Sequence, residues 1–331
     1  MNGIPKLVLR ACALLCLAAL AACVWAQTTR VSRPAASPPD RGPVLVELFT
    51  SEGCPHCPEA DALLEKMYTE QSVEDAQIIA LEEHVDYWDR QAWVDHFSSS
   101  LFTARQQSYA DAMDLDSLYT PQMVVDGLVE LVGNNESRAR ATISALGRAP
   151  LPSVRILQEP PGDADKALPA ALRVRLEAHG LSPDSLADIY LVVGEDKLFS
   201  RVGGGRNSGE TWPHSCIARR FQLLGKLPVG KGDFSMVSEL APPQPGWRLE
   251  NLHLIAFVQE EDSRRILALG TAPLAGFLPG ARGAGRPAAG TVPPHSSGAV
   301  PNFAGHSSNP VWATGSTSAS QRRNQVSGVG D

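Results

Sequence analysis

The sequence runs Val44-Leu45-Val46-Glu47-Leu48-Phe49 and then, after a short turn, Cys54-Pro55-His56-Cys57. The first segment is almost continuously apolar and contains β-branched residues, which is typical of a central, buried strand. Pro58 stands in the expected first turn of a helix, where proline is tolerated. Two cysteines separated by two residues, where a strand gives way to a helix, can act as a dithiol/disulfide couple.

The cysteine motif predicts distinct roles for its residues. Unpaired backbone N–H groups and the helix dipole favour a thiolate at a helix N-terminus, so we expect Cys54 to be the exposed attacking sulfur. Cys57 is expected one turn further in, more buried, as the resolving thiol. His56 can donate a hydrogen bond or positive charge to the Cys54 thiolate, which makes the disulfide more oxidising. The motif does not set the direction of electron flow.

Other uses of the same cysteines stay open. They can form a static disulfide, or hold a metal ion. Structural zinc usually needs four Cys or His ligands, and with no second C-x-x-C in the chain they would have to include distant histidines such as His84 and His96. We favour redox chemistry and assign neither a metal nor a cofactor.

The first 26 residues are typical of an export signal. A basic segment precedes an apolar run, residues 11–22, that is too short to span a bilayer comfortably. Leu20-Ala21-Ala22-Cys23 resembles a lipobox, in which a lipidated Cys23 would tether the protein to a membrane, whereas Val24-Trp25-Ala26 resembles an ordinary signal-peptidase site. Both alternatives predict export, to the periplasm or as a membrane-anchored lipoprotein of a bacterial envelope.

Export leaves an odd number of cysteines in the body of the protein: Cys54, Cys57 and Cys216. An oxidising compartment permits a disulfide, and Cys54 with Cys57 is the obvious pair. Cys216 is then a free thiol, which we interpret as a small buried apolar side chain.

The pattern along the chain predicts two domains. Strand and helix signals alternate as β-α-β-α-β-β-α and predict a mixed sheet with flanking helices, followed by alternating strands that predict an all-β, sandwich-like domain. The predicted divisions are a signal peptide (1–26), a linker (27–42), an α/β domain (43–148), a β-rich domain (149–278) and a disordered tail (279–331). A formal net charge of -7 argues against nucleic acid as the main partner.

Three segments in order resemble motifs of the DUF1223 family, secreted bacterial proteins of uncharacterised function: residues 46–64, 84–89 and 119–127. The resemblance covers residues 44–146 closely and implies a thioredoxin-like fold there. Cys-Pro-His-Cys also looks like the motif of the periplasmic disulfide oxidant DsbA.

The resemblance implies further site residues. Pro121 would be a cis-proline opposite the cysteines, and Thr120 would hydrogen-bond the substrate chain. Glu47 either corresponds to a buried carboxylate that handles the proton of the resolving cysteine, or is a strand-edge residue without a catalytic role. His84 and Asp86, two residues apart, are expected to face the same side, where they either line the cleft near Cys54 or satisfy loop backbone.

A later segment, residues 206–214, looks like an altered family motif. Asn207, Gly209 and His214 match it, while its charged positions differ, which puts the function of the segment in doubt. As a whole, the sequence predicts a periplasmic thiol–disulfide oxidoreductase that acts on a protein or small-thiol substrate with a redox partner protein. The alternative is a non-enzymatic envelope binding module, in which Cys54 and Cys57 hold copper or form a structural disulfide.

Overall fold

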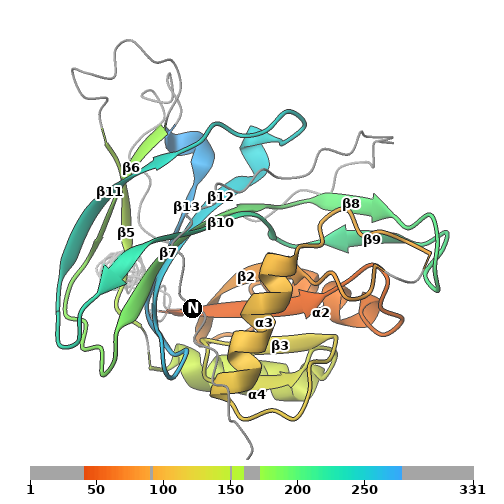
Figure 1. Cartoon of the computed structure of the whole chain (residues 1–331), viewed down its shortest axis with the longest axis horizontal. Helices are drawn as coiled ribbons and strands as arrows, with labels where there is room; N and C mark the ends of the chain where they lie inside the picture. The colour runs from red at the N-terminus through yellow and green to blue at the C-terminus, as the bar shows by residue number, and fades with distance from the viewer. Residues whose placement is uncertain (1–40, 90–91, 150, 160–171, 278–331) are drawn as a thin grey trace, which may run out of the picture. The chain divides into compact units, whose positions relative to one another are not determined.

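The computed structural model describes residues 41–89, 92–149, 151–159 and 172–277 (Figure 1). The predicted signal peptide with Cys23, nearly all of the predicted linker and the predicted tail lie outside these residues. Within the described part of the chain, no helix is long and apolar enough to cross a membrane.

The elements alternate between strand and helix in the first half of the chain and are almost all strands in the second. In chain order they are β1 (Gly42–Thr50), α2 (Pro58–Glu70), β2 (Ala76–His84), α3 (Ser100–Ala112), β3 (Gln122–Val125), β4 (Val129–Val132), α4 (Glu136–Gly147), β5 (Arg155–Gln158), β6 (Leu172–Ala178), β7 (Ala187–Glu195), β8 (Leu198–Arg201), β9 (Thr211–His214), β10 (Ile217–Leu227), β11 (Phe234–Leu240), η2 (Leu249–Asn251), β12 (Leu252–Glu260), β13 (Ile266–Pro273) and η3 (Leu274–Phe277).

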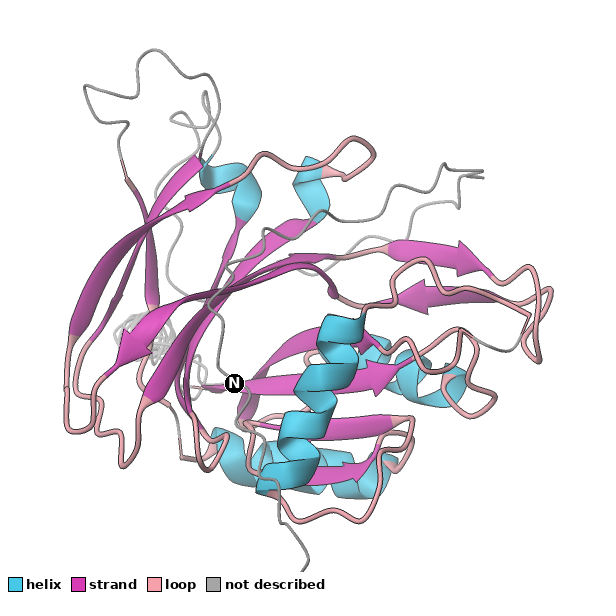
Figure 2. Ribbon diagram, viewed as in Figure 1, coloured by secondary structure: helices cyan, strands magenta, loops and turns pink. Residues whose placement is uncertain are grey.

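The main sheet is mixed and has eight strands in the order β13-β12-β7-β10-β2-β1-β3-β4. Figure 2 shows the longer helices, in cyan, gathered beside one part of the strands. β1 runs parallel to β2 and antiparallel to β3. Successive side chains of β1 point to opposite faces. Phe49 packs with Tyr109 of α3, whereas Leu48 belongs to the core cluster that contains Leu64 of α2 and Ile143 of α4. The helices therefore cover both faces of this part of the sheet.

The second half of the chain continues the same sheet, where we expected a separate domain after residue 148. β10 joins β2 in parallel through the pair Ile217–Glu82, which covers an edge that would otherwise expose unpaired backbone groups. The three-stranded sheet β11-β6-β5 packs against the main sheet, with Val174 and Leu176 meeting Leu191 and Leu254 in one buried cluster. The fold is thus mixed α/β, with one large mixed sheet and further antiparallel strands.

A loop with several polar residues separates β2 from α3. α3 starts only after Ser99, whose side chain accepts a hydrogen bond from the N–H of Leu101 as an N-cap. The preceding loop is held by its own polar side chains. Ser98 Oγ donates to Asp89 Oδ2 at 2.8 Å. This loop places Asp95 beside the end of β2.

Candidate functional site

Cys54 and Cys57 form a disulfide, with their Cα atoms 5.5 Å apart. Both residues are 0% exposed, so the expectation of an exposed Cys54 is wrong for this oxidised state. The expected helix position is also wrong. α2 begins at Pro58 with Cys57 as its N-cap, and Cys54 lies in the turn before it. The reason is that Pro58 has no N–H to donate to the carbonyl group of Cys54, four residues earlier.

The carbonyl group of Cys54 accepts a long hydrogen bond from the backbone N–H of Cys57, at 3.4 Å, and a shorter one from a residue in the second half of the chain. Asn207 Nδ2 donates to Cys54 O at 2.8 Å and to Glu52 O at 2.9 Å. Asn207 is buried in the loop of the β8–β9 hairpin. Earlier in this loop, a Cβ atom added to Gly203 would come within 2.6 Å of the Trp93 ring. The hairpin loop therefore packs over the turn that carries the disulfide.

The Thr120–Pro121 peptide bond is cis, as the resemblance implied. Thr120 Oγ1 accepts a hydrogen bond from Trp88 Nε1 at 2.7 Å, and a Cβ atom on Gly53 would lie 3.1 Å from Trp88 Cβ. Trp88 therefore connects the cis-proline loop to the residue that precedes Cys54. We did not single out Trp88, although it stands in one of the family-like segments.

His56 is exposed, in the turn between the two cysteines. Its side chain has no hydrogen-bond partner among the residues that the structure describes. The expected contact with a Cys54 thiolate belongs to the reduced form and stays a prediction.

Glu47 lies on a central strand and is fully buried, so it is not the strand-edge residue of one alternative. Arg105 Nε donates to Glu47 Oε1 at 2.7 Å, and the hydroxyl group of Tyr109 donates to Oε2. Both of these partners belong to α3. The role of Glu47 in handling the proton of the resolving cysteine belongs to the reduced form and stays a prediction.

Asp61, which we did not predict, is a buried carboxyl group one helical turn after Cys57. Its backbone N–H donates to Cys57 O at 3.0 Å, and its Oδ2 accepts from Thr50 Oγ1 at 3.1 Å. Burial, assisted by the charge of Glu82, raises the pKa of Asp61 well above its usual range. The i,i+4 spacing from Cys57 was the available signal.

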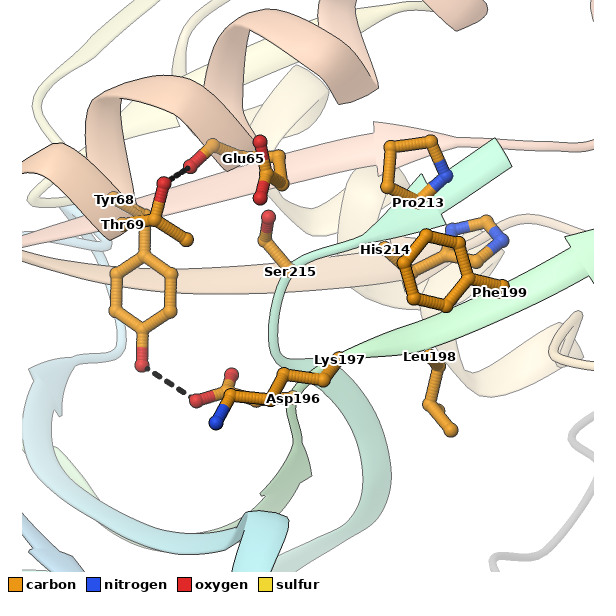
Figure 3. A pocket seen from close by; sticks show the side chains of 10 residues that line it. All are labelled: Glu65, Tyr68, Thr69, Asp196, Lys197, Leu198, Phe199, Pro213, His214 and Ser215. Atoms are coloured by element: carbon orange, nitrogen blue, oxygen red, sulfur yellow. Dashed lines mark hydrogen bonds between the residues drawn. The ribbon is translucent and has the colours of Figure 1, made fainter. Parts of the chain in front are cut away.

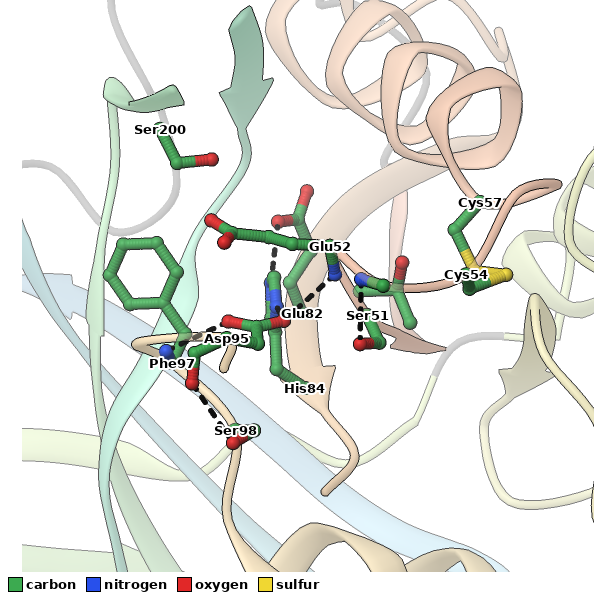
Figure 4. Close-up of polar contacts among 12 residues, drawn as sticks. Ser51, Glu52, Cys54, Cys57, Glu82, His84, Asp95, Phe97, Ser98 and Ser200 are labelled. Atoms are coloured by element: carbon green, nitrogen blue, oxygen red, sulfur yellow. Dashed lines mark hydrogen bonds and ion pairs between the residues drawn. A yellow bond between two sulfur atoms is a disulfide. The ribbon is translucent and has the colours of Figure 1, made fainter. Parts of the chain in front are cut away.

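His84 and Asp86 do not share a site. β2 ends at His84, and the alternation of a strand does not extend to Asp86, whose Oδ1 accepts from Thr103 Oγ1 at 2.6 Å. His84 Nδ1 instead lies 2.7 Å from Asp95 Oδ2, within a cluster of buried polar groups (Figure 4).

The cluster, which we call the Glu82–His84–His214 cluster, joins β2 to the β8–β9 hairpin. Glu82 Oε2 lies 3.1 Å from His214 Nδ1 and 3.7 Å from His84 Nε2. Glu82, His84 and His214 are almost completely buried, and one ligand atom from each lies within 4.8 Å of the others. The sequence left His214 in doubt and gave no signal that it meets Glu82.

The buried carboxyl groups of this cluster create an electrostatic environment that favours a positive charge. Burial opposes the imidazolium form, yet Asp95 and Glu82 raise the pKa of His84 well above its usual range. Burial likewise favours the neutral acids, but His214 and His84 outweigh it and lower the pKa of Glu82. Similarly, His84 outweighs burial and lowers the pKa of Asp95.

A small cavity of about 40 Å³ lies beside the turn between β9 and β10, and His214 and Ser215 are among its lining residues (Figure 3). Its volume suits water rather than a drug-sized ligand. Cys216, in the same turn, is a buried free thiol, as expected. Burial, with Asp196 and Glu82, raises its pKa well above the usual range, which fits an inert side chain.

The family model of DUF1223, described as a protein of unknown function, matches residues 45–259. Because the match spans more than half of the 331 residues, the chain belongs to this family. The match includes both the cysteine motif and Asn207 and His214 of the hairpin, on either side of the predicted domain boundary.

Two solved structures are similar in fold. One is a protein of Agrobacterium tumefaciens solved as a structural-genomics target, with 22% sequence identity and a TM-score of 0.52, covering 70% of this chain and 94% of that one. The other is HBP35 of Porphyromonas gingivalis, with 12% identity and a TM-score of 0.51, covering 77% of this chain and 81% of that one. No curated protein matches the chain.

Proposed function

We propose that this protein is a thiol–disulfide oxidoreductase, in which Cys54 is the attacking and Cys57 the resolving sulfur. The observation that carries the proposal is the position of the disulfide between β1 and α2: Trp88 packs against Gly53, directly before Cys54, and donates a hydrogen bond to Thr120 in the loop before β3. A purely structural disulfide does not need the cis-proline loop beside it. An exchange enzyme needs a surface next to its reactive sulfur on which the substrate chain can bind.

The topology supports a thioredoxin-like assignment for residues 43–148. The strand order β2-β1-β3-β4, with β1 parallel to β2 and β3 antiparallel to β1, leaves the cysteine turn and the cis-proline loop at the same end of the sheet. This resembles the arrangement of the thioredoxin-like superfamily. Here β10 to β13 extend the sheet from its β2 edge.

The chemistry is a balanced two-electron exchange. In the dithiol form, the Cys54 thiolate attacks a substrate disulfide, forms a mixed disulfide and releases one substrate thiolate. The Cys57 thiolate then attacks Cys54 Sγ and displaces the second substrate thiolate, which leaves the Cys54–Cys57 disulfide. Asp61, one turn after Cys57, is our candidate to take the Cys57 proton. The reverse sequence oxidises a substrate dithiol.

The burial of both sulfurs requires a local opening before exchange. The β8–β9 hairpin is the element to move, because Asn207 holds the turn that carries Cys54 through two hydrogen bonds. We propose that opening of this hairpin admits a protein or small-thiol substrate, and that a partner protein restores the redox state. The proposal includes export, since an oxidised C-x-x-C pair persists outside the reducing cytosol.

Single-cysteine variants test the assignment of the two sulfurs. In full-length Cys57→Ser, Cys54 should form a mixed disulfide with 5,5′-dithiobis(2-nitrobenzoate) at least about 10-fold faster than Cys216, because an activated thiolate is the nucleophile. Cys57 in Cys54→Ser should react more slowly than Cys54. Peptide-level mass spectrometry distinguishes these sites from the other cysteines of the chain. A Cys54 that reacts no faster than Cys216 overturns the proposal.

A further inference from the structure

We propose that Glu82, His84 and His214 form a binding site for a divalent transition-metal ion, with zinc as the ion to test. The site uses neither cysteine, so it is separate from the thiol chemistry proposed above. Two imidazoles and one carboxylate are a donor set that zinc and other first-row transition metals accept, often with one position left for water.

The spacing of the donor atoms fits a single ion. Zinc–nitrogen and zinc–oxygen bonds of about 2.0–2.2 Å in a tetrahedral arrangement place neighbouring ligand atoms roughly 3.3–3.5 Å apart. Glu82 Oε2 lies 3.1 Å from His214 Nδ1 and 3.7 Å from His84 Nε2. All three ligand atoms lie within 4.8 Å of one another, so the side chains need to close in only by rotamer adjustment to surround one ion.

In each of the three ligand residues, the side-chain atom that faces away from the ion already has a hydrogen-bond partner, as is usual for metal ligands. His84 Nδ1 donates to Asp95 Oδ2 at 2.7 Å, so Nε2 is the ring atom left for an ion, which would displace the proton from this nitrogen on binding. His214 Nε2 lies 2.7 Å from Ser200 Oγ. Glu82 Oε1 accepts the backbone N–H of Ser215 at 2.8 Å. These contacts select the nitrogen and oxygen atoms that remain for the ion.

Two buried polar atoms that lack a hydrogen-bond partner in the described part of the chain independently support a ligand at this site. His84 Nε2 and Glu52 Oε1 are buried and have no hydrogen-bond partner among the described residues. Glu52 Oε1 lies 3.9 Å from His214 Nε2, at the border of the cluster. With Glu52 and Asp95, the cluster holds three carboxyl groups against two imidazoles, all of them buried. A divalent cation offsets this excess of negative charge.

A bound ion would also help to stabilise the turn that carries the Cys54–Cys57 disulfide, although it would contact neither cysteine. Its ligands come from β2 and from the end of β9, so it would link the β8–β9 hairpin to the main sheet. Asp95 Oδ2 accepts from both His84 Nδ1 and the backbone N–H of Glu52, two residues before Cys54. The position of the site therefore favours a structural role for the ion, next to the turn that carries the proposed redox disulfide.

The test is zinc binding to the full-length, metal-stripped protein with the Cys54–Cys57 disulfide intact, measured by isothermal titration calorimetry and elemental analysis. We expect one zinc ion per chain. His84→Gln and His214→Gln should each weaken binding by at least about 100-fold, and Asp95→Asn by about 10- to 100-fold. His96→Gln, an exposed histidine next to Asp95, is the matched control and should bind like the wild type.

Ser200→Ala keeps the test decisive if the ligand variants fail to fold, because it removes only the outer partner of His214 and should weaken zinc binding measurably. Zinc-induced thermal stabilisation provides a second readout and should be lost in parallel. Three results overturn the proposal: no stoichiometric zinc in the oxidised protein, zinc affinity unchanged in folded His84 and His214 variants, or zinc uptake only after reduction of the cysteines.

Discussion

Replacing Asn207 by alanine should loosen the disulfide turn without touching a sulfur atom. The Asn207 amide donates to two buried carbonyl groups, those of Cys54 and Glu52, at 2.8 and 2.9 Å. Each such hydrogen bond contributes a net free energy of about 0.5–1.5 kcal/mol, so the substitution should favour the open hairpin by about 1–3 kcal/mol. Since 1.4 kcal/mol is about a factor of ten, the open population rises by roughly 5- to 140-fold.

The assay is the rate at which limiting dithiothreitol reduces Cys54–Cys57 in the native protein, followed by alkylation and mass spectrometry. If opening precedes exchange, the rate in Asn207→Ala should rise by the same factor as the open population. Ser208→Ala, an exposed change in the same loop, should leave the rate unchanged.

A control variant separates local from global opening. Ile143→Val in α4 removes one buried methyl group and should lower the free energy of unfolding by about 0.5–1.5 kcal/mol without touching the hairpin. It should have little effect on the reduction rate. An Asn207→Ala protein that is reduced at the wild-type rate would refute the idea that the hairpin covers the site, and so would equal acceleration in Ile143→Val.

Two further predictions concern buried charges around the sheet. Burial raises the pKa of Asp126 to about 7, so the stability this carboxyl group contributes is full below about pH 4 and is lost as the pH rises towards 7. Asp126→Asn should therefore be the more stable protein at pH 8, by up to about 4 kcal/mol, and the difference should shrink towards pH 4, as measured by urea unfolding. Arg105→Met removes the guanidinium group that pairs with the buried side chains of Glu47 and Glu83. It should lower the free energy of unfolding by about 3–5 kcal/mol at pH 8. The loss should be smaller at pH 5, because burial raises the pKa of Glu83 and favours its neutral form; equal losses at both pH values in urea unfolding would contradict this prediction.

The parts of the site that the sequence predicts are local ones. The strand before Cys54 and the helix after it follow from apolar patterning and from the position of Pro58 within a few residues. The cis bond before Pro121 was accessible only through the family resemblance. Local patterns also misled where an element ended early. The expected pairing of His84 with Asp86 failed because β2 stops at His84.

The rest of the site depends on contacts between distant segments. His214 meets Glu82 across 132 residues, because β10 pairs in parallel with β2 at Ile217. Nothing in the periodicity of either strand specifies that pairing. For the same reason the burial of Cys54 could not be read from its position, since the residue that covers its turn, Asn207, lies 153 residues further on.

The most direct test of the central claim is the equilibrium of the native Cys54–Cys57 pair with a graded dithiol redox buffer, followed by alkylation. Thiol–disulfide exchange predicts reversible reduction in the folded protein, with a midpoint between about -270 and -120 mV, the span of known exchange enzymes. Cys216 should remain a buried thiol throughout. A midpoint below about -300 mV, or reduction only after the protein unfolds, would identify a fixed structural bridge and contradict the account.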